Sequence, residues 1–154
     1  MRFSCAARTD VGIVRSGNED NYLMLDDRGV FIVADGMGGH AAGEVASEMA
    51  VNTIAKELST LKGLTDDEIG ERMRSAIRTA NSAIFDRTLT EHDKRGMGTT
   101  ATALVLLAGR YLLGQVGDSR GYRLRDGQWL HVTQDHSYVQ EQVVSWRLRP
   151  EQAR

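Results

Sequence analysis

Four consecutive apolar residues, 31–34, run directly into the segment Asp35-Gly36-Met37-Gly38-Gly39-His40. Such a run predicts a strand buried on both faces. An ionised aspartate at the end of a buried strand is costly unless a cation or strong hydrogen-bond donors meet it. Gly36 has no side chain, so its carbonyl can approach a ligand closely. The segment therefore predicts a site where a strand delivers one carboxylate to an open, glycine-lined edge.

Two other interpretations of this segment are open. Asp-Gly pairs are common in turns, so Asp35-Gly36 is also compatible with a simple turn. The pattern Gly36-x-Gly38-x-x-Ala41 fits the dinucleotide-binding fingerprint, with Glu57 at about the right distance. Glu57 lies inside a helical pattern, however, and the charge of Asp35 would face the pyrophosphate. These two features disfavour dinucleotide binding.

The spacing of two acids around one turn adds to the site hypothesis. Residues 21–25 and 30–35 are predicted strands, joined by a turn at residues 26–29. A symmetric hairpin makes Asp20 and Asp35 direct cross-strand partners, with Cβ atoms about 4.5–5.5 Å apart. Like charges at that distance destabilise a sheet unless a divalent cation lies between them, and Mg²⁺ or Mn²⁺ suits oxygen ligands. The alternative is two solvated acids at the open end of a hairpin.

Two amphipathic helices are predicted to follow the hairpin. The first covers residues 42–61. The second begins at a capping box formed by Thr65 and Glu68 and ends near Arg87. The apolar stripe of the first helix comprises Val45, Met49, Thr53, Ile54 and Leu58. The predicted buried face of the second comprises Ile69, Met73, Ala76, Ile77, Ala80 and Ile84.

A second β region begins at Gly96, where the hydrophobic period changes to two. It predicts an antiparallel meander over residues 99–107, 111–116, 121–124 and 129–132, and residues 2–9 are predicted to form an opening strand. Two antiparallel β regions separated by two long helices exclude a parallel doubly wound fold. They indicate an α+β layered sandwich.

Two further polar motifs lie in this second region. Asp118 follows a predicted strand, between Gly117 and Ser119, and on its own is typical of a turn. Asp135-His136-Ser137 invites comparison with a catalytic triad, but three adjacent residues cannot form one hydrogen-bonded line. Asp135 or Ser137 is instead expected to cap a helix over residues 138–144.

Size and composition are those of one globular domain. The chain has 154 residues, 41% hydrophobic and 26% charged, with a formal net charge of −2. This balance gives no reason to expect nucleic acid or an anionic membrane as a partner. The single cysteine, Cys5, cannot form an internal disulfide, and no apolar run suggests a signal peptide or a membrane span. We therefore expect a cytoplasmic monomer with one domain over residues 1–154.

Taken in order, five short motifs resemble those of the protein phosphatase 2C-type (PPM) metal-dependent Ser/Thr phosphatases, and the bacterial branch most closely. The motifs are Arg15-Ser16-Gly17-Asn18-Glu19-Asp20, Val33-Ala34-Asp35-Gly36-Met37-Gly38-Gly39-His40, Gly96-Met97-Gly98-Thr99-Thr100, Val116-Gly117-Asp118-Ser119-Arg120 and Thr133-Gln134-Asp135-His136-Ser137. The resemblance implies a four-layer α/β/β/α sandwich of two antiparallel sheets flanked by helices. Two Mn²⁺ or Mg²⁺ ions would lie at one edge.

The same resemblance assigns expected roles by position. Asp35 would bridge both metals and Gly36 would ligate through its carbonyl. Asp20 would ligate one metal, with Glu19 acting directly or through water. Arg15 would hold the substrate phosphate and Asp118 a third, weaker metal. A water shared by the two metals would attack the phosphorus of phosphoserine or phosphothreonine in line, without a covalent enzyme intermediate.

The sequence departs from the family pattern at two places. Met37 stands where eukaryotic members have a histidine directly after the Asp-Gly, so His40 is the candidate general acid. The family also has two metal-ligating aspartates further downstream, in Asp-Gly and Asp-Asn motifs. After Ser137 the only acids are Glu141 and Glu151, neither in such a motif. We therefore expect the chain to correspond to the N-terminal portion of a phosphatase, truncated at its C-terminus.

Two functional hypotheses follow. The first is a metal-dependent protein Ser/Thr phosphatase acting on phosphoserine and phosphothreonine proteins, with a Ser/Thr protein kinase as a candidate partner. The second is an inactive phosphatase-like module that binds phosphoproteins or regulates a partner. Because two ligands are missing, the 154 residues alone are expected to bind metal weakly and to show little or no catalysis.

Overall fold

The computed structural model describes residues 2–38 and 42–136. Strands β1 (Asp20–Leu25) and β2 (Val30–Met37) form a hairpin around a short 3-10 turn, η1 (Asp26–Arg28). Helices α1 (Ala42–Glu57) and α2 (Asp66–Thr90) follow, and η2 (His92–Lys94) leads into the second β region. This region contains β3 (Gly98–Thr99), β4 (Ala101–Leu107), β5 (Arg110–Val116), β6 (Tyr122–Arg125) and β7 (Gln128–His131).

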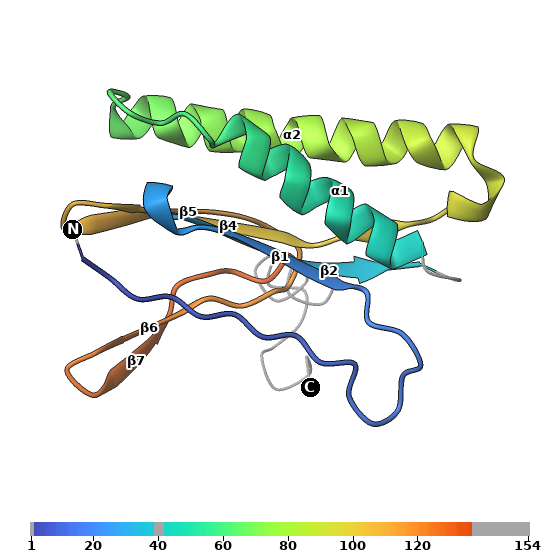
Figure 1. Cartoon of the computed structure of the whole chain (residues 1–154), viewed down its shortest axis with the longest axis horizontal. Helices are drawn as coiled ribbons and strands as arrows, with labels where there is room; N and C mark the ends of the chain where they lie inside the picture. The colour runs from blue at the N-terminus through green and yellow to red at the C-terminus, as the bar shows by residue number, and fades with distance from the viewer. Residues whose placement is uncertain (1, 39–41, 137–154) are drawn as a thin grey trace, which may run out of the picture.

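The strands form two antiparallel sheets. Strands β1, β2, β4 and β5 pair in that order, and β3 pairs with the end of β2. Strands β6 and β7 form a separate two-stranded sheet. Both helices cover one face of the larger sheet, and the β6–β7 hairpin and the N-terminal segment lie on its other side (Figure 1). The predicted α+β sandwich of two antiparallel sheets with helices is thus confirmed.

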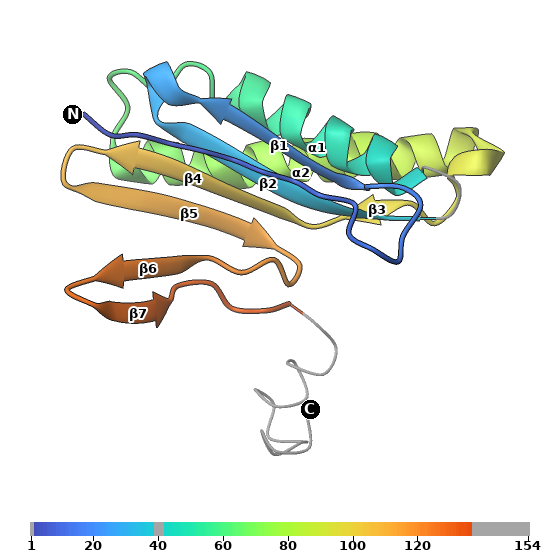
Figure 2. The same ribbon diagram turned by 60° about the horizontal axis from the view of Figure 1, so that its bottom comes forward.

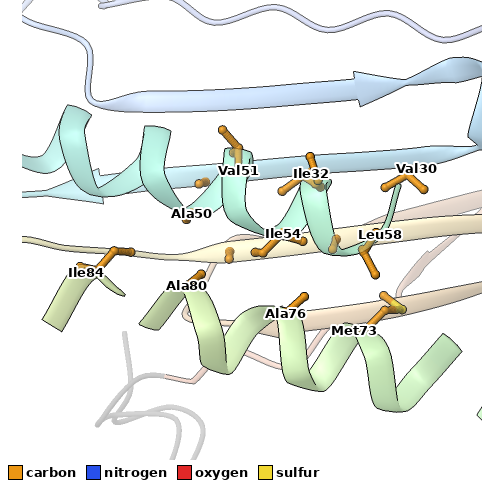
Figure 3. Packing of buried hydrophobic residues seen from close by; sticks show 14 of the residues in the cluster. Val30, Ile32, Ala50, Val51, Ile54, Leu58, Met73, Ala76, Ala80 and Ile84 are labelled. Atoms are coloured by element: carbon orange, nitrogen blue, oxygen red, sulfur yellow. The ribbon is translucent and has the colours of Figure 1, made fainter. Parts of the chain in front are cut away.

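The core lies between the helices and the larger sheet (Figure 3). Its largest fully buried side chains include Ile32 of β2, Ile54 of α1, Leu58 directly after α1, and Ile69 of α2. Burial of one such side chain stabilises the fold by roughly 1.5–3 kcal/mol. On α2 the predicted buried face is confirmed except that Ile77 is only partly buried, and the Thr65–Glu68 capping box is present. No helix in the described part of the chain has both the length and the apolar character needed to cross a membrane.

The predicted apolar stripe of α1 is wrong in one respect. The buried face of α1 is made mainly of small residues, with Val51 and Ile54 as its large members, whereas Val45 and Met49 are only partly buried. These small residues are Ala42, Gly43, Ala46, Ser47, Ala50 and Ala55. Small side chains let the helix approach the strands closely, and Val45 and Met49 lie at the margin of the core. The closest approach is at the N-terminal end of α1, beside the predicted site.

Three other expectations are corrected. Residues 2–9 form no strand; Phe3 instead packs edge-on against Phe31, with ring centroids 5.7 Å apart. The meander does not continue from β5 to β6, because the chain leaves the larger sheet over residues 117–121 before the β6–β7 hairpin begins (Figure 2). Helix α1 ends at Glu57 and α2 extends to Thr90. The helix expected over residues 138–144 lies outside the described residues.

Candidate metal and phosphate site

The two acids predicted to face each other do so. In the β1–β2 hairpin Asp20 is the cross-strand partner of Asp35, at the open end of the ladder. This register confirms the predicted symmetric turn, in which Leu25 pairs with Val30. The pKa of the Asp35 carboxyl is raised, first by its partial burial and then by the nearby charges of Asp20 and Asp118, while Arg15 acts in the opposite direction. The acid pair therefore carries an electrostatic cost in the protein without metal.

Gly36 fixes how closely the site approaches helix α1. A Cβ atom at this position would lie 2.1 Å from the carbonyl oxygen of Gly43 and 2.6 Å from that of Glu19. The Gly36 amide donates a hydrogen bond to the Glu19 carbonyl at 3.1 Å. No side chain fits here, so strand β2, the residue before β1 and the first turn of α1 meet through their backbones.

An open cleft of about 930 Å³ lies at this edge. Arg15, Glu19, Asp35 and Gly36 all contribute to its lining, together with Glu44 from α1. A smaller hollow of about 280 Å³ on the other side of the acid pair is lined by Asp20, Asp35 and Ser119, and by the two arginines Arg8 and Arg120. Asp35 lines both spaces. A carboxylate and an exposed guanidinium thus face one cleft, an arrangement able to hold a cation and an anion side by side.

The remaining predicted site residues occupy different positions. The Glu19 carboxylate packs against Gly43, where a Cβ would lie 2.6 Å from its Oε2, so it shares the cleft with Asp35 but belongs to the helix side. Asp118 lies in the exposed loop after β5, close enough for its charge to raise the Asp35 pKa. His40, the candidate general acid, lies outside the described residues, so its role stays a prediction. Asp135 caps no described helix and instead forms a bidentate ion pair with Arg120, the shortest contact being 2.7 Å.

The donors present suit a hard divalent cation. Asp20 and Asp35 offer carboxylate oxygens on one face of the hairpin, and oxygen ligands are those that Mg²⁺ and Mn²⁺ prefer. A doubly charged ion between the two acids would offset the repulsion that raises the Asp35 pKa. Among residues 2–38 and 42–136, no three His, Cys, Asp or Glu side chains converge into a metal-binding cluster. The described residues therefore fit a metal as an open pair of ligands, to be completed by others.

Three residues at the site were missed by sequence reasoning. Gly43 allows the close approach just described. Ser47 is fully buried in α1, and its hydroxyl donates to the Glu19 carbonyl at 2.6 Å. The same hydroxyl accepts a hydrogen bond from the side-chain amide of Asn21 at 3.0 Å. Thr100 accepts a hydrogen bond from the Asp35 amide at 2.9 Å. A glycine and a serine within the helical pattern of residues 42–61 were the available signals for the first two, because both residue types are poor helix formers.

Comparisons with known proteins identify the family. The sequence signature described as "Protein phosphatase 2C" matches residues 15–149. The serine/threonine protein phosphatase PstP of Mycobacterium tuberculosis is 43% identical over 152 residues, covering 96% of this chain and 28% of that protein. The serine/threonine phosphatase stp of Listeria monocytogenes is 41% identical, covering 95% of this chain and 60% of that protein. The chain thus spans less than two thirds of these relatives.

Solved structures agree in fold. The crystal structure of the PstP catalytic domain in complex with two manganese ions superposes with a TM-score of 0.81 at 41% identity, covering 96% of this chain and 62% of that one. A serine/threonine phosphatase from S. agalactiae gives a TM-score of 0.86 at 35% identity, with 94% and 61% covered. With its acid pair at the edge of the sheet and a family match over most of its length, the chain belongs to the protein phosphatase 2C family.

Proposed function

We propose that this protein takes part in the metal-dependent hydrolysis of phosphoserine and phosphothreonine in proteins. The observation that carries the proposal is the direct pairing of Asp20 with Asp35 beside a cleft that also contains Arg15. Two supports come from outside the chain: relatives at 41–43% identity are named serine/threonine phosphatases, and one similar structure holds two manganese ions. Bound divalent ions would supply charge stabilisation and an activated water.

The residues of this chain have separable tasks in that reaction. Asp35 and Asp20, with the Gly36 carbonyl, would hold the ions at the sheet edge, and Asp118 would hold a third. Arg15 would orient the phosphoryl group, because its planar guanidinium donates to two oxygens at once. The backbone contacts at Gly36 and Gly43 keep this edge rigid. We further propose the cytoplasm as the setting, a monomeric state, and a Ser/Thr protein kinase as the partner that generates the substrate.

The second candidate is a phosphoprotein-binding module without turnover. Its specific support is that the described residues supply a pair of ligands rather than a cluster of three. In such a module Arg15 would still contact a phosphate, but no bound water would be activated. The two functions differ in one measurable respect, which is release of phosphate.

A chimera provides the test. Residues 1–136 of this chain would be joined to the part of M. tuberculosis PstP that aligns after residue 136 and to the rest of its catalytic domain. Hydrolysis of p-nitrophenyl phosphate and of a phosphothreonine peptide would be followed with Mn²⁺ and with EDTA. We expect Mn²⁺-dependent turnover that Asp35→Asn abolishes. Arg15→Ala should raise KM more than Arg15→Lys does. Undiminished turnover in Asp35→Asn would refute the mechanism.

The unmodified 154-residue chain is assayed in parallel with the chimera. We expect weak Mn²⁺ binding and little turnover from it. Saturable phosphopeptide binding by both proteins, with no phosphate released by either at any Mn²⁺ concentration, would favour the binding module.

A further inference from the structure

Thr100 lies at a break in the β ladder, opposite the central aspartate. Strands β3 and β4 pair with β2 in one common register, with Gly36 opposite Thr99 and Val33 opposite Thr102. That register places Thr100 opposite Asp35, yet Thr100 belongs to neither strand. The Asp35 amide donates to the Thr100 side-chain oxygen Oγ1 at 2.9 Å, and the Thr100 amide donates to the Asp35 carbonyl at 2.9 Å. A side-chain hydroxyl has thus replaced a backbone carbonyl as acceptor.

The backbone of Asp35 is held on both sides as a result. The Thr99 hydroxyl lies near two carbonyls, 3.0 Å from that of Asp35 and 2.8 Å from that of Thr100. Its single proton is donated to one of the two or shared between them. The local exception to strand pairing therefore occurs at the residue that carries the bridging carboxylate.

The other side of Thr100 contacts the Asp118 loop. Its Oγ1 lies 2.7 Å from the Ser119 hydroxyl, directly after Asp118 in the chain. A Cβ at Gly117, directly before Asp118, would lie 2.7 Å from the Thr100 methyl group. Gln115 completes the attachment, because its side-chain amide donates to the carbonyls of Gly117 at 3.1 Å and Ser119 at 2.9 Å. The loop that presents Asp118 is thus fixed to Thr100 by a hydrogen bond and by packing.

We propose that Thr100 is a positioning residue that holds the Asp35 and Asp118 carboxylates as one unit, through a hydroxyl relay from the Asp35 amide to Ser119. A hydroxyl can accept one hydrogen bond and donate another at the same time, which no apolar side chain of this shape can do. The metal-related part of this inference rests on the proposed function, because only there do both carboxylates act as ligands. Displacement of one aspartate is then transmitted to the other.

Three variants separate this role from ordinary strand packing. Thr100→Val keeps the shape but removes the relay, and Thr100→Ser keeps the hydroxyl but removes the methyl group. Thr102→Val is a matched control two residues further on, since the buried Thr102 hydroxyl has no hydrogen-bond partner in the described part of the chain. If Thr100→Val fails to fold, Ser119→Ala breaks the relay at its far end and replaces it in the same measurements.

The primary measurement is ¹H–¹⁵N NMR of the metal-free chain. In Thr100→Val we expect faster hydrogen exchange of the Asp35 amide and shifted amide resonances for Asp118 and Ser119. Thr100→Ser should restore wild-type behaviour, and Thr102→Val should leave these resonances unchanged. Asp35→Asn should shift the Asp118 amide more in the wild-type background than in Thr100→Val, because the direct effect of the Asp35 charge is present in both. The proposal would be overturned if Thr100→Val kept the wild-type exchange rate of the Asp35 amide and the wild-type amide resonances. It would also be overturned if Thr100→Val and Thr100→Ser changed them equally.

Mn²⁺ titration of the same variants provides the second measurement. Loss of a residue that orients metal ligands typically weakens binding about 10–100-fold, so we expect at least about a tenfold loss in Thr100→Val and little in Thr100→Ser. A wild-type chain that binds no Mn²⁺ would count against the proposed function. The NMR measurements would still decide the role of Thr100, because they use neither metal nor substrate.

Discussion

The two ends of the β1–β2 hairpin contain the same residue type in different surroundings. At the closed end, the Asp26 carboxylate accepts a hydrogen bond from the Asp27 amide, and Asp27 lies 3.5 Å from the Arg28 guanidinium. At the open end, Asp20 and Asp35 face each other, and the pKa of Asp35 is raised first by its partial burial and then by the charge of Asp20. Among the described residues, the two carboxylates meet one hydroxyl, that of Thr9, which donates to Asp20 at 3.4 Å. The acids of the turn have local partners, whereas no Lys, Arg or His side chain among residues 2–38 and 42–136 forms an ion pair with Asp20 or Asp35.

The difference shows how a structural aspartate is distinguished from a functional one. Asp26 stabilises the conformation of the turn itself, and removing its charge would alter only that turn. Asp35 raises the energy of the metal-free protein, and the surrounding backbone is built to keep it in place. A carboxylate that is held firmly and left without a cation indicates a ligand-binding position.

Glycine substitutions at the two ends test this comparison with the largest expected effect. Gly36→Ala places a methyl group against the carbonyls of Gly43 and Glu19. We therefore expect the free energy of unfolding to fall by about 3 kcal/mol or more, or the variant not to fold. Gly29→Ala forces alanine into the left-handed conformation seen at φ +67° and brings its Cβ to 2.9 Å from the Leu106 carbonyl oxygen, a milder contact than at Gly36. It should cost about 2 kcal/mol. Chemical denaturation of both variants measures the difference. Equal decreases in the free energy of unfolding of the two variants would contradict a tighter backbone contact at the open end.

Charge removal at the two ends tests the electrostatic part. Asp35→Asn should stabilise the metal-free chain by a few tenths to about 1 kcal/mol at pH 7, because it removes a like charge opposite Asp20. Asp27→Asn is the control and should give no gain. Folding raises the pKa of Asp35 above its ordinary value of 3.8, so the ionised carboxylate destabilises the folded protein at pH 7. This destabilisation disappears as the pH falls through the raised pKa toward 3.8. The gain in stability of Asp35→Asn over the wild type should therefore shrink in melting curves recorded at lower pH. A gain that does not change with pH would argue against charge repulsion as its cause.

The ion pair between Arg120 and Asp135 provides a second comparison, in which the aspartate stabilises the folded protein instead of destabilising it. Hydrogen bonding to the Arg120 guanidinium lowers the pKa of Asp135 in the folded state. Its stabilising contribution is present at neutral pH and is lost as the pH falls below 3.8 and through the lowered pKa. Asp135→Asn should lower the melting temperature slightly at pH 7, the smallest shift of the three, and this difference should disappear as the pH falls through the lowered Asp135 pKa. A difference in melting temperature that persists in acid would show that Asp135 stabilises the fold by packing rather than by its ion pair.

Local rules were sufficient for several features. The turn at residues 26–29 sets the hairpin register, and the register alone brings Asp20 opposite Asp35. The capping box at Thr65 and the period of α2 gave its start and its buried face. In each case, neighbours in sequence determine the geometry.

Features that depend on distant contacts could not be predicted in this way. The small residues of α1 face the sheet because the helix approaches it closely, a packing effect with no sign in hydrophobic periodicity. The break at Thr100 depends on contacts with Asp35 and Ser119, which lie 65 and 19 residues away in sequence. Residues 117–121 leave the larger sheet although the hydrophobic period continues into β6.

Mn²⁺ titration of the 154-residue chain, followed by water-proton relaxation, tests the central claim that the open end of the hairpin is a metal site. The wild type, Asp35→Asn and the closed-end control Asp27→Asn would be compared at pH 7. We predict equal, weak binding by the wild type and Asp27→Asn, with affinity at least about tenfold lower in Asp35→Asn. Indistinguishable binding curves for all three proteins would contradict the account.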